Sequence, residues 1–417
     1  MTEKKLKVMT ISDHPLSPSG VGTQTKYMIE HLLKTGRYQF ICFGGAIKHP
    51  DYRPQKIETY GDDLLIYPVD GYGTPDKVKQ ALEMHKPDVL WFMTDPRFYE
   101  WLWDIEDEIR QNVPMVYYHV WDNYPYPKFN SKYYMSNDMV VTISKLTDDI
   151  VRTLAPEVEC HYLPHSVDLN VFKKLETNNI EAIKKQNFGD KFMFFWNSRN
   201  ARRKLSGSVL WWFAEFLEEV GRENAILVMH TDPKDQHGQD LQAILEELGL
   251  INGEVKFSIE KRSFEEMSIL YNCADATICA SDAEGFGLSC LESLCCETPV
   301  IATLTGGLQD QVIADDGTHL GVGIEPASKA VIGSQAVPYI YEDRISKEDF
   351  IAALRKMFNM SKEERLELGK KCREQVEKNF NPDKLLDNWD KLLTELHNKA
   401  GSWDTRNHKR WTLKEIK

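Results

Sequence analysis

The sequence predicts an α/β protein built from two tandem domains, each a mostly parallel sheet with helices on both faces. Three observations lead to this expectation. Short apolar runs alternate with amphipathic stretches in two long blocks, and a polar segment at residues 176–190 separates the blocks. The 417 residues are 42% hydrophobic, and domains usually hold about 100–200 residues. We therefore expect domains at residues 1–175 and 176–380.

The first block begins with a buried strand over residues 6–11, a loop over 12–22 and a helix over 23–33. The loop carries Gly20 and Gly22 just before the helix. Short apolar runs predict the remaining strands and helical periodicity predicts the remaining helices. The strands are expected at residues 39–43, 64–67, 89–93, 115–118 and 139–143, and the helices at residues 76–85 and 100–111.

The second block repeats this alternation after the polar segment. Strands are expected at residues 192–197, 225–230, 255–257, 276–280 and 300–302, and helices at residues 209–220, 240–248, 264–272 and 288–296. A charged helical tail follows, in which Ser361 to Glu364 reads as a capping box. Pro382 should break the tail before a last helix. We expect residues 381–417 to pack back on the first domain.

Composition narrows the class of protein. The formal net charge is −13, which disfavours unspecific binding to nucleic acid or anionic lipid. The eight cysteines include no Cys-x-x-Cys pair, so a zinc site is not expected and the cysteines read as reduced core residues. The start lacks the apolar segment of a signal peptide, and no apolar run reaches the roughly 20 residues of a membrane helix. We expect a cytoplasmic protein with no integral membrane segment. The sequence does not determine its oligomeric state.

The most informative segment follows the strand at 276–280 and opens the helix at 288–296. It reads Ser-Asp-Ala-Glu-Gly-Phe-Gly-Leu-Ser-Cys-Leu-Glu over residues 281–292. Gly285 and Gly287 allow a ligand to approach the backbone, and free amides at a helix start favour a diphosphate or sugar hydroxyls. Glu284 and Glu292 can face one cleft. Taken alone, the two glutamates favour a simpler interpretation, in which Glu284 is a solvated loop acid and Glu292 an exposed helix acid.

The wider sequence resembles the family 4 retaining glycosyltransferases. Glu-Gly-Phe-Gly-Leu, a second glutamate eight positions after the first, and Thr-Pro-Val-Ile-Ala at residues 298–302 carry the resemblance. The Gly-Val-Gly at residues 20–22, the Pro-His-Ser-Val-Asp at residues 164–168, and Arg199 with Lys204 extend it. The resemblance implies the GT-B fold, in which two facing Rossmann-like, doubly wound domains enclose a cleft. It also implies an N-terminal acceptor-binding domain and a C-terminal donor-binding domain.

The resemblance implies specific roles on the donor side. Glu284 should contact the hydroxyls of the transferred sugar, and Glu292 should contact the ribose of the nucleotide. Arg199 and Lys204 should neutralise the leaving diphosphate. Arg202 and Arg203 fit a solvated turn as well as a functional role. The remaining donor-binding residues expected from the resemblance are Gly20, Gly22, Gly285, Phe286, Gly287 and Leu288.

The acceptor side is less specific. The resemblance places His119, at the end of a strand, near the donor sugar, with Asp122 on the same loop. Asp95 and Arg97 follow another strand, where an acceptor would bind, and Trp121 belongs to an aromatic-rich stretch that fits both core packing and stacking on a sugar. A lone histidine at a strand end is also a common structural residue.

Two departures from the family pattern matter. Glu297 stands where glycine usually ends the helix, so the helix end is expected to differ. The segment at 164–168 carries His165-Ser166 where Asn-Gly is usual. No Asp-x-Asp occurs in the chain, so we expect no metal and no other cofactor.

The resulting prediction is a retaining, metal-independent glycosyltransferase that uses a UDP- or GDP-sugar and an unidentified acceptor. Three alternatives stay open: transfer to a modified nucleic-acid base, a phosphorylase of the same fold, and a catalytically inactive binding subunit. No lysine is marked as a pyridoxal site, which disfavours the phosphorylase. The net charge disfavours the nucleic-acid acceptor. Intact Glu284, Glu292, Arg199 and Lys204 disfavour the inactive subunit.

Overall fold

Two parallel sheets, stacked end to end across a cleft, organise the chain. The computed structural model describes residues 4–121 and 126–408. The first sheet has the strand order β3-β4-β2-β1-β5-β6-β7-β8, and only β3 runs antiparallel to its neighbour. Its strands are β1 (Leu6–Asp13), β2 (Tyr38–Gly45), β3 (Gln55–Lys56), β4 (Leu64–Pro68), β5 (Val89–Met93), β6 (Met115–His119), β7 (Met139–Thr142) and β8 (Glu159–Tyr162).

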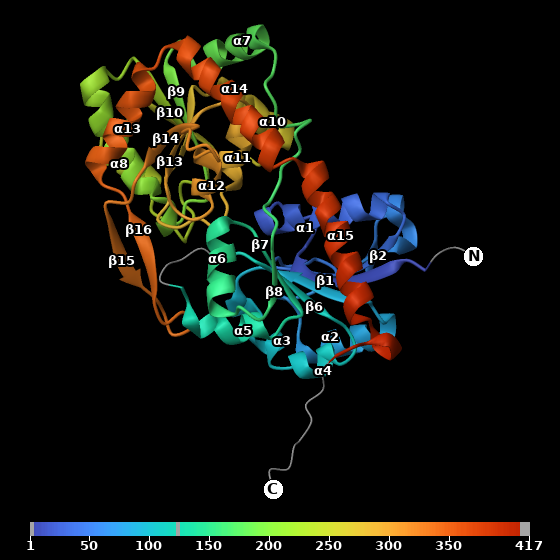
Figure 1. Ribbon diagram of the computed structural model, residues 1–417. Helices are drawn as coiled ribbons and strands as arrows, with labels where there is room; N and C mark the ends of the chain where they lie inside the picture. The colour runs from blue at the N-terminus through green and yellow to red at the C-terminus, as the bar shows by residue number, and fades with distance from the viewer. Residues whose placement is uncertain (1–3, 122–125, 409–417) are drawn as a thin grey trace.

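Helices cover both faces of this first sheet (Figure 1). The helix predicted over 100–111 is split into α3 and α4. The helices are α1 (Gly20–Lys34), α2 (Pro75–His85), α3 (Glu100–Trp103), α4 (Glu106–Arg110), α5 (Ser131–Met135) and α6 (Lys145–Leu154), with 3₁₀ turns η1 (Glu58–Asp63), η2 (Pro96–Phe98) and η3 (Lys128–Asn130).

The second sheet has the order β11-β10-β9-β12-β13-β14 and is parallel throughout. Its strands are β9 (Phe192–Asn197), β10 (Ala225–His230), β11 (Val255–Ser258), β12 (Ala276–Cys279), β13 (Val300–Thr303) and β14 (Gly321–Ile324). The helices around it are α7 (Thr177–Phe188), α8 (Ser206–Val220), α9 (Leu241–Glu247), α10 (Phe264–Cys273), α11 (Leu288–Cys295), α12 (Leu308–Val312) and α13 (Lys347–Asn359), with the turn η4 (Arg202–Lys204).

Three elements lie outside this repeating pattern. A two-stranded antiparallel hairpin, β15 (Ser328–Ile332) and β16 (Ile340–Arg344), follows the second sheet. Helix α14 (Lys362–Asn379) and helix α15 (Pro382–Ala400) then cross from the second domain to the first (Figure 1). Ser361 and Glu364 form a capping box at the start of α14, and Pro382 begins α15.

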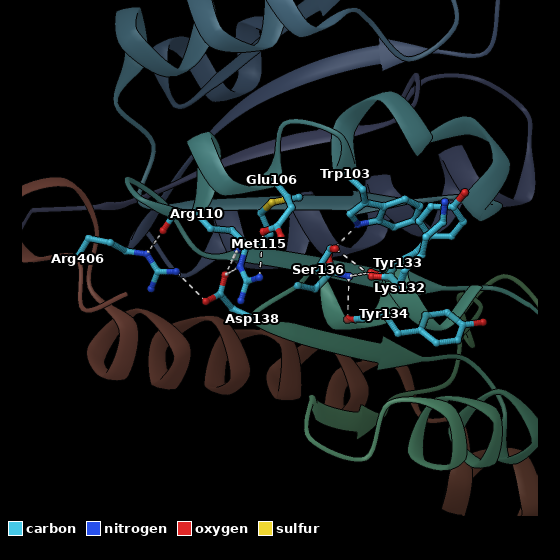
Figure 2. A network of polar contacts seen from close by, with 11 residues as sticks. Trp103, Glu106, Arg110, Met115, Lys132, Tyr133, Tyr134, Ser136, Asp138 and Arg406 are labelled. Carbon is cyan, nitrogen blue, oxygen red and sulfur yellow. Dashed lines mark hydrogen bonds and ion pairs between the residues drawn. The ribbon is translucent and has the colours of Figure 1, made fainter. Parts of the chain in front are cut away.

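Helix α15 and the residues after it pack against the first domain. Trp389 of α15 packs edge-on against Trp91 and Tyr118, with ring centroids 5.8 Å and 5.0 Å away. After the short turn η5 (Trp403–Thr405), the buried Arg406 guanidinium donates to Asp138 Oδ1 at 2.7 Å. Asp138 also accepts from Arg110 at 3.1 Å, as Figure 2 shows. The last described residues therefore lie on the first domain, although the chain has passed through the second domain before them.

The connectivity fixes where a ligand can bind. In the first sheet the chain winds outward from β1 in one direction and from β5 in the other, and in the second sheet from β9 and from β12. Open α/β sheets bind ligands at the carboxyl ends of the strands where the winding reverses. The residues that follow β1, β5, β9 and β12 are therefore the ones placed to bind a ligand.

Candidate functional site

A cleft of about 940 Å³ lies between the two sheets, at the strand ends that the connectivity selects. Gly20 follows β1, and Asp95 follows β5. Arg199 follows β9, and Glu284 follows β12. All four residues line the cleft. The further predicted residues that line it are Arg97, Trp121, Lys204, Gly285, Phe286, Gly287, Leu288 and Glu292.

The glycine loop of the first domain closely approaches the second domain. Ser19 caps α1 by accepting from the Gly22 amide at 3.0 Å. A Cβ on Gly20 would lie 3.0 Å from Leu288 Cδ1, so the start of α1 faces the start of α11 across the cleft. Gly22 is not among the lining residues. A Cβ there would come within 2.8 Å of the His14 carbonyl oxygen, so this glycine serves the packing of its own loop.

The loop before α11 is held by a left-handed cap and a close backbone crossing. Gly287 occupies the N-cap position with φ 93°, where a side chain would be strained. The Gly307 amide donates to the Glu284 carbonyl oxygen at 3.0 Å. A Cβ on Gly307 would lie 2.5 Å from the Gly285 carbonyl oxygen. This packing fixes Glu284 and the following amides at the cleft surface.

Lys204 and Glu284 form the central ion pair of the cleft. The Lys204 ammonium donates to Glu284 Oε2, and Arg203 Nη1 approaches the same oxygen at 3.2 Å. Burial alone would raise the pKa of Glu284, but the Lys204 and Arg203 charges lower it to about 2. Burial lowers the pKa of Lys204, and Glu284 only partly offsets that effect. Glu284 is therefore ionised, and Lys204 is a desolvated cation that can exchange its partner for a diphosphate.

Arg199 and Arg202, which belong to the same segment as Lys204, bind different partners. Arg199 is a rim residue whose guanidinium donates to Asp235 Oδ2 at 2.6 Å. Arg202 donates to both oxygens of Glu342, at 2.6 Å and 2.7 Å. Glu342 is 3% exposed and belongs to β16. The Arg202 side chain is 60% exposed in the turn η4, and its bonds to Glu342 tie the hairpin to the segment that carries Lys204.

Glu292 is held by a buried hydrogen-bonded chain. Tyr271 donates to Glu292 Oε2 at 2.6 Å, and Asn197 Nδ2 donates to the Tyr271 hydroxyl at 2.8 Å. Burial raises the pKa of Glu292 to about 7, and the Tyr271 hydrogen bond counteracts part of that rise. Glu292 thus faces the cleft as a carboxyl group that titrates near neutral pH.

His119, which was expected near the donor sugar, is not among the residues that line the cleft. Its side chain is fully buried, with Nδ1 3.3 Å from the Tyr117 hydroxyl and the ring packed 4.8 Å from Tyr134. Burial lowers the pKa of His119 to about 3, so the imidazole is neutral. Strand β6 turns this side chain into the core. Asp122 lies outside the described residues.

The acceptor-side residues that do line the cleft combine charge and an aromatic ring. Arg97 donates two hydrogen bonds to Asp95, both at 2.9 Å, which holds the pair at the end of β5. Trp121 is 5% exposed, and its indole Nε1 has no hydrogen-bond partner among the described residues. A ring and an ion pair at one surface can bind a polar cyclic molecule by stacking and by hydrogen bonds.

Sequence reasoning missed the hairpin and Tyr271. The β-branched residues Val331 and Ile332 before Gly333, and Ile340 after it, were a weak strand signal. Tyr271 gave no signal, because a tyrosine in an amphipathic helix is usually a core residue. Glu297 has φ 58°, so the helix end is left-handed despite the glutamate. Gly369 makes room, since a Cβ there would lie 2.1 Å from the Glu297 carbonyl oxygen.

No group of three or more His, Cys, Asp and Glu residues is arranged to hold a metal ion in the part of the chain that the structure describes. Within residues 4–121 and 126–408, none of the helices combines the length and apolar character needed to cross a bilayer.

Residues 181–357 match the family described as Glycosyl transferases group 1. D-inositol 3-phosphate glycosyltransferase from Corynebacterium jeikeium is 36% identical over 115 residues, which are 27% of this chain and 26% of that protein. The same enzyme from Corynebacterium urealyticum is 39% identical over 90 residues, 22% of this chain and 21% of that protein. The chain therefore spans only about a quarter of the length of these curated relatives.

Solved structures resemble the whole chain. Sucrose-phosphate synthase from Thermosynechococcus elongatus superposes with a TM-score of 0.75 at 16% identity, covering 95% of this chain and 100% of that one. HepE from Anabaena, in complex with UDP-glucose, has a TM-score of 0.69 at 15% identity, covering 94% and 100%. These likenesses concern the fold. The chain has the predicted GT-B fold of two facing Rossmann-like domains.

Proposed function

We propose that this chain, which carries a group 1 glycosyl transferase domain at residues 181–357, moves a sugar from a nucleotide-diphosphate sugar to an acceptor. The donor would lie on the second domain and the acceptor on the first. The proposal extends to retention at the anomeric carbon and to activity without a metal ion. The observation that carries it is the Lys204–Glu284 pair at the cleft surface, beside the start of α11.

The two members of the ion pair would bind different parts of the donor. A diphosphate brings negative charge to Lys204 and competes with Glu284 for the ammonium. Because Glu284 is ionised, it can then accept hydrogen bonds from the hydroxyls of the sugar. The amides of Gly285 to Leu288 lie at the start of α11, where the helix dipole favours an anion. Glu292 would accept from the ribose hydroxyls.

The residues favour same-face substitution. The acceptor hydroxyl oxygen would bond to the anomeric carbon as the bond from that carbon to the diphosphate oxygen breaks. The acceptor proton would pass to the departing phosphate, and Lys204 with Arg199 would stabilise the charge that develops there. Glu284 would serve the sugar hydroxyls, so it is not assigned as a nucleophile. The same two cations supply the charge that a divalent ion provides in other sites.

Structural relatives guide the choice of donor. HepE from Anabaena was solved with UDP-glucose, so UDP-glucose comes first in a panel of UDP- and GDP-sugars. The curated relatives are named for inositol 3-phosphate, but the matched region is too short to transfer that acceptor. Release of UDP or GDP from one donor, lowered by about 10²–10³ in Lys204→Ala, would support the proposal. The proposal would be contradicted if the wild-type chain bound and hydrolysed none of the donors in the panel.

Metal use and stereochemistry need separate measurements. We expect activity to survive excess EDTA and an α-linked donor to yield an α-linked product. The anomeric proton signal in NMR spectra of the product distinguishes the two stereochemical outcomes. A β-linked product would contradict retention. Inactivation by EDTA that Mn²⁺ restores would contradict metal independence, while leaving sugar transfer itself intact.

A further inference from the structure

The β15–β16 hairpin bridges the cleft from the donor domain to the acceptor domain. Its five residue pairs run from Ser328 opposite Arg344 to Ile332 opposite Ile340. In Figure 1 the hairpin leaves the second domain and extends toward α5 and α6 of the first, on the edge of the molecule opposite the α14–α15 crossover. The cleft is thus bounded by chain on both of these edges.

The root of the hairpin is tied to the donor wall. Glu342 accepts both guanidinium hydrogen bonds of Arg202, two positions before Lys204. Arg344 Nη1 lies 3.0 Å from Asp282 Oδ2, and the Asp343 amide donates to the Asp282 carbonyl oxygen at 2.9 Å. Asp282 stands two positions before Glu284. The root is therefore anchored directly beside the ion pair that would bind the donor.

The tip of the hairpin packs into the first domain. Val337 is 5% exposed and belongs to the same apolar cluster as Trp121. Tyr339 meets Phe129 edge-on at 5.4 Å, and Phe129 meets Trp121 edge-on at 6.0 Å. A continuous row of rings therefore runs from the hairpin of one domain to a cleft residue of the other.

The hairpin also supplies part of the cleft surface. Ile332, Gly333, Ser334 and Val337 line the same cleft as Trp121, Asp95 and Arg97. The volume of about 940 Å³ is at the upper end of the roughly 300–1,000 Å³ typical of sites for one small ligand. A bound nucleotide sugar would occupy part of this volume, and the remainder lies beside the hairpin residues and Trp121.

We propose that the β15–β16 hairpin selects the acceptor, admitting a single-ring polyol such as a monosaccharide and excluding oligosaccharide chains. This inference rests on the proposed function and adds the acceptor class. The indole of Trp121 offers a face for the ring, and Asp95, Arg97 and Ser334 offer partners for hydroxyls. A chain acceptor that extended along the hairpin side of the cleft would meet the docked tip, where Val337 and Tyr339 contact the first domain.

The test compares Val337→Ser with the matched control Val331→Ser. Val331 lies on the same hairpin but is 62% exposed and does not line the cleft. Tyr339→Ala, which removes the ring contact, is a second variant in case Val337→Ser folds poorly. Each protein is incubated with UDP-glucose, or with another UDP- or GDP-sugar that the donor panel identifies, and offered water alone, glucose, myo-inositol or maltoheptaose. The affinity for UDP or GDP is measured in parallel by calorimetry.

The wild type and Val331→Ser should use a single-ring acceptor and give no product with maltoheptaose above the hydrolysis background. Loss of the buried valine contact should lower the single-ring preference of Val337→Ser by about tenfold and raise donor hydrolysis by water, at unchanged nucleotide affinity. Tyr339→Ala should change both in the same direction. Equal acceptor preference and equal hydrolysis in all four proteins would overturn the inference, as would wild-type transfer to maltoheptaose or to none of these acceptors. A wild-type chain that binds no donor would overturn the proposed function itself.

Discussion

The two walls of the cleft are built in different ways. The donor-side wall is charged and comes from two short segments, 199–204 and 281–292, that follow neighbouring strands β9 and β12 of one sheet. The acceptor-side wall combines the Asp95–Arg97 ion pair with the ring of Trp121, and Phe129 joins Trp121 to Tyr339 of the other domain. One wall is local in sequence, and the other exists only after the domains have met.

This difference follows from what each wall would bind. A diphosphate presents the same charge in every nucleotide sugar, so cations and amides at fixed strand ends suffice. An acceptor is distinguished by size and shape, and a surface shared by two domains can change those properties without altering the donor-binding segments. The comparison therefore predicts large losses of activity on the donor side and changes of selectivity on the acceptor side.

The largest effect is expected for Lys204→Ala. Loss of this cation removes stabilisation of the leaving diphosphate and should lower kcat by about 10²–10³ with UDP-glucose, or with the donor that the panel identifies. Lys185→Ala is the control, because Lys185 is exposed on α7. The variant leaves Arg203 as the cation that pairs with Glu284. Circular dichroism verifies that the variant still folds. Unchanged turnover in the folded variant would remove the central premise of the charged wall.

A smaller, divided effect is expected for the two glutamates. Glu284→Gln should lower kcat by about 10- to 100-fold, as expected for the loss of a hydrogen bond to a charged group. Glu292→Gln should instead weaken nucleotide binding, with little change in kcat at saturation. Steady-state kinetics combined with calorimetry of UDP and GDP separates the two effects. If neither variant differed from the wild type, neither glutamate would have a role in the reaction.

Arg202→Gln tests whether the two walls are separable. Both hydrogen bonds of the Arg202 guanidinium to Glu342 hold the hairpin root, so nucleotide affinity should change by less than about twofold. The single-ring preference should fall as in Val337→Ser. A large loss of UDP or GDP affinity, measured by calorimetry, would instead place Arg202 in the diphosphate site and merge the two walls.

Sequence patterns predicted the strands that are buried apolar runs, as in Val89–Met93 and Met115–His119. They did not predict β3, β8 and β14. The hairpin was missed because β15 is largely exposed and because Val337, at the tip, packs into the other domain. The helix expected over 100–111 was wrong at its centre. There Ile105, with φ −115° and ψ 17°, separates α3 from α4.

For the site, sequence indicated which loops line the cleft but not which way each side chain points. Glu284, Glu292 and Lys204 line it because they follow strand ends at which the winding reverses. His119 stands at a strand end too, yet the alternation of side chains along β6 directs it into the core. Gly369 shows the same limit, since only tertiary packing relates it to the left-handed Glu297.

The smallest effect is expected for Tyr271→Phe, and it concerns pH. Burial raises the pKa of Glu292 to about 7, and ribose hydroxyls donate best to the ionised carboxylate. Nucleotide affinity should therefore rise as pH increases through about 7 and level off above it. The Tyr271 hydroxyl favours the ionised form by donating at 2.6 Å. Its loss should raise the pKa of Glu292 and move the midpoint of the affinity profile upward by about one pH unit.

Tyr52→Phe provides the matched control, because Tyr52 also donates to a carboxylate at 2.6 Å, that of Asp70, away from the cleft. Calorimetric titrations of UDP, or of GDP if the donor panel selects a GDP-sugar, between about pH 6 and pH 8 give the midpoint for each protein. A merely structural Tyr271 would lower affinity equally at every pH. A displaced midpoint, by contrast, requires that the hydroxyl act through the charge of Glu292. A midpoint equal to that of the wild type would therefore separate Tyr271 from nucleotide binding, even if the variant bound more weakly.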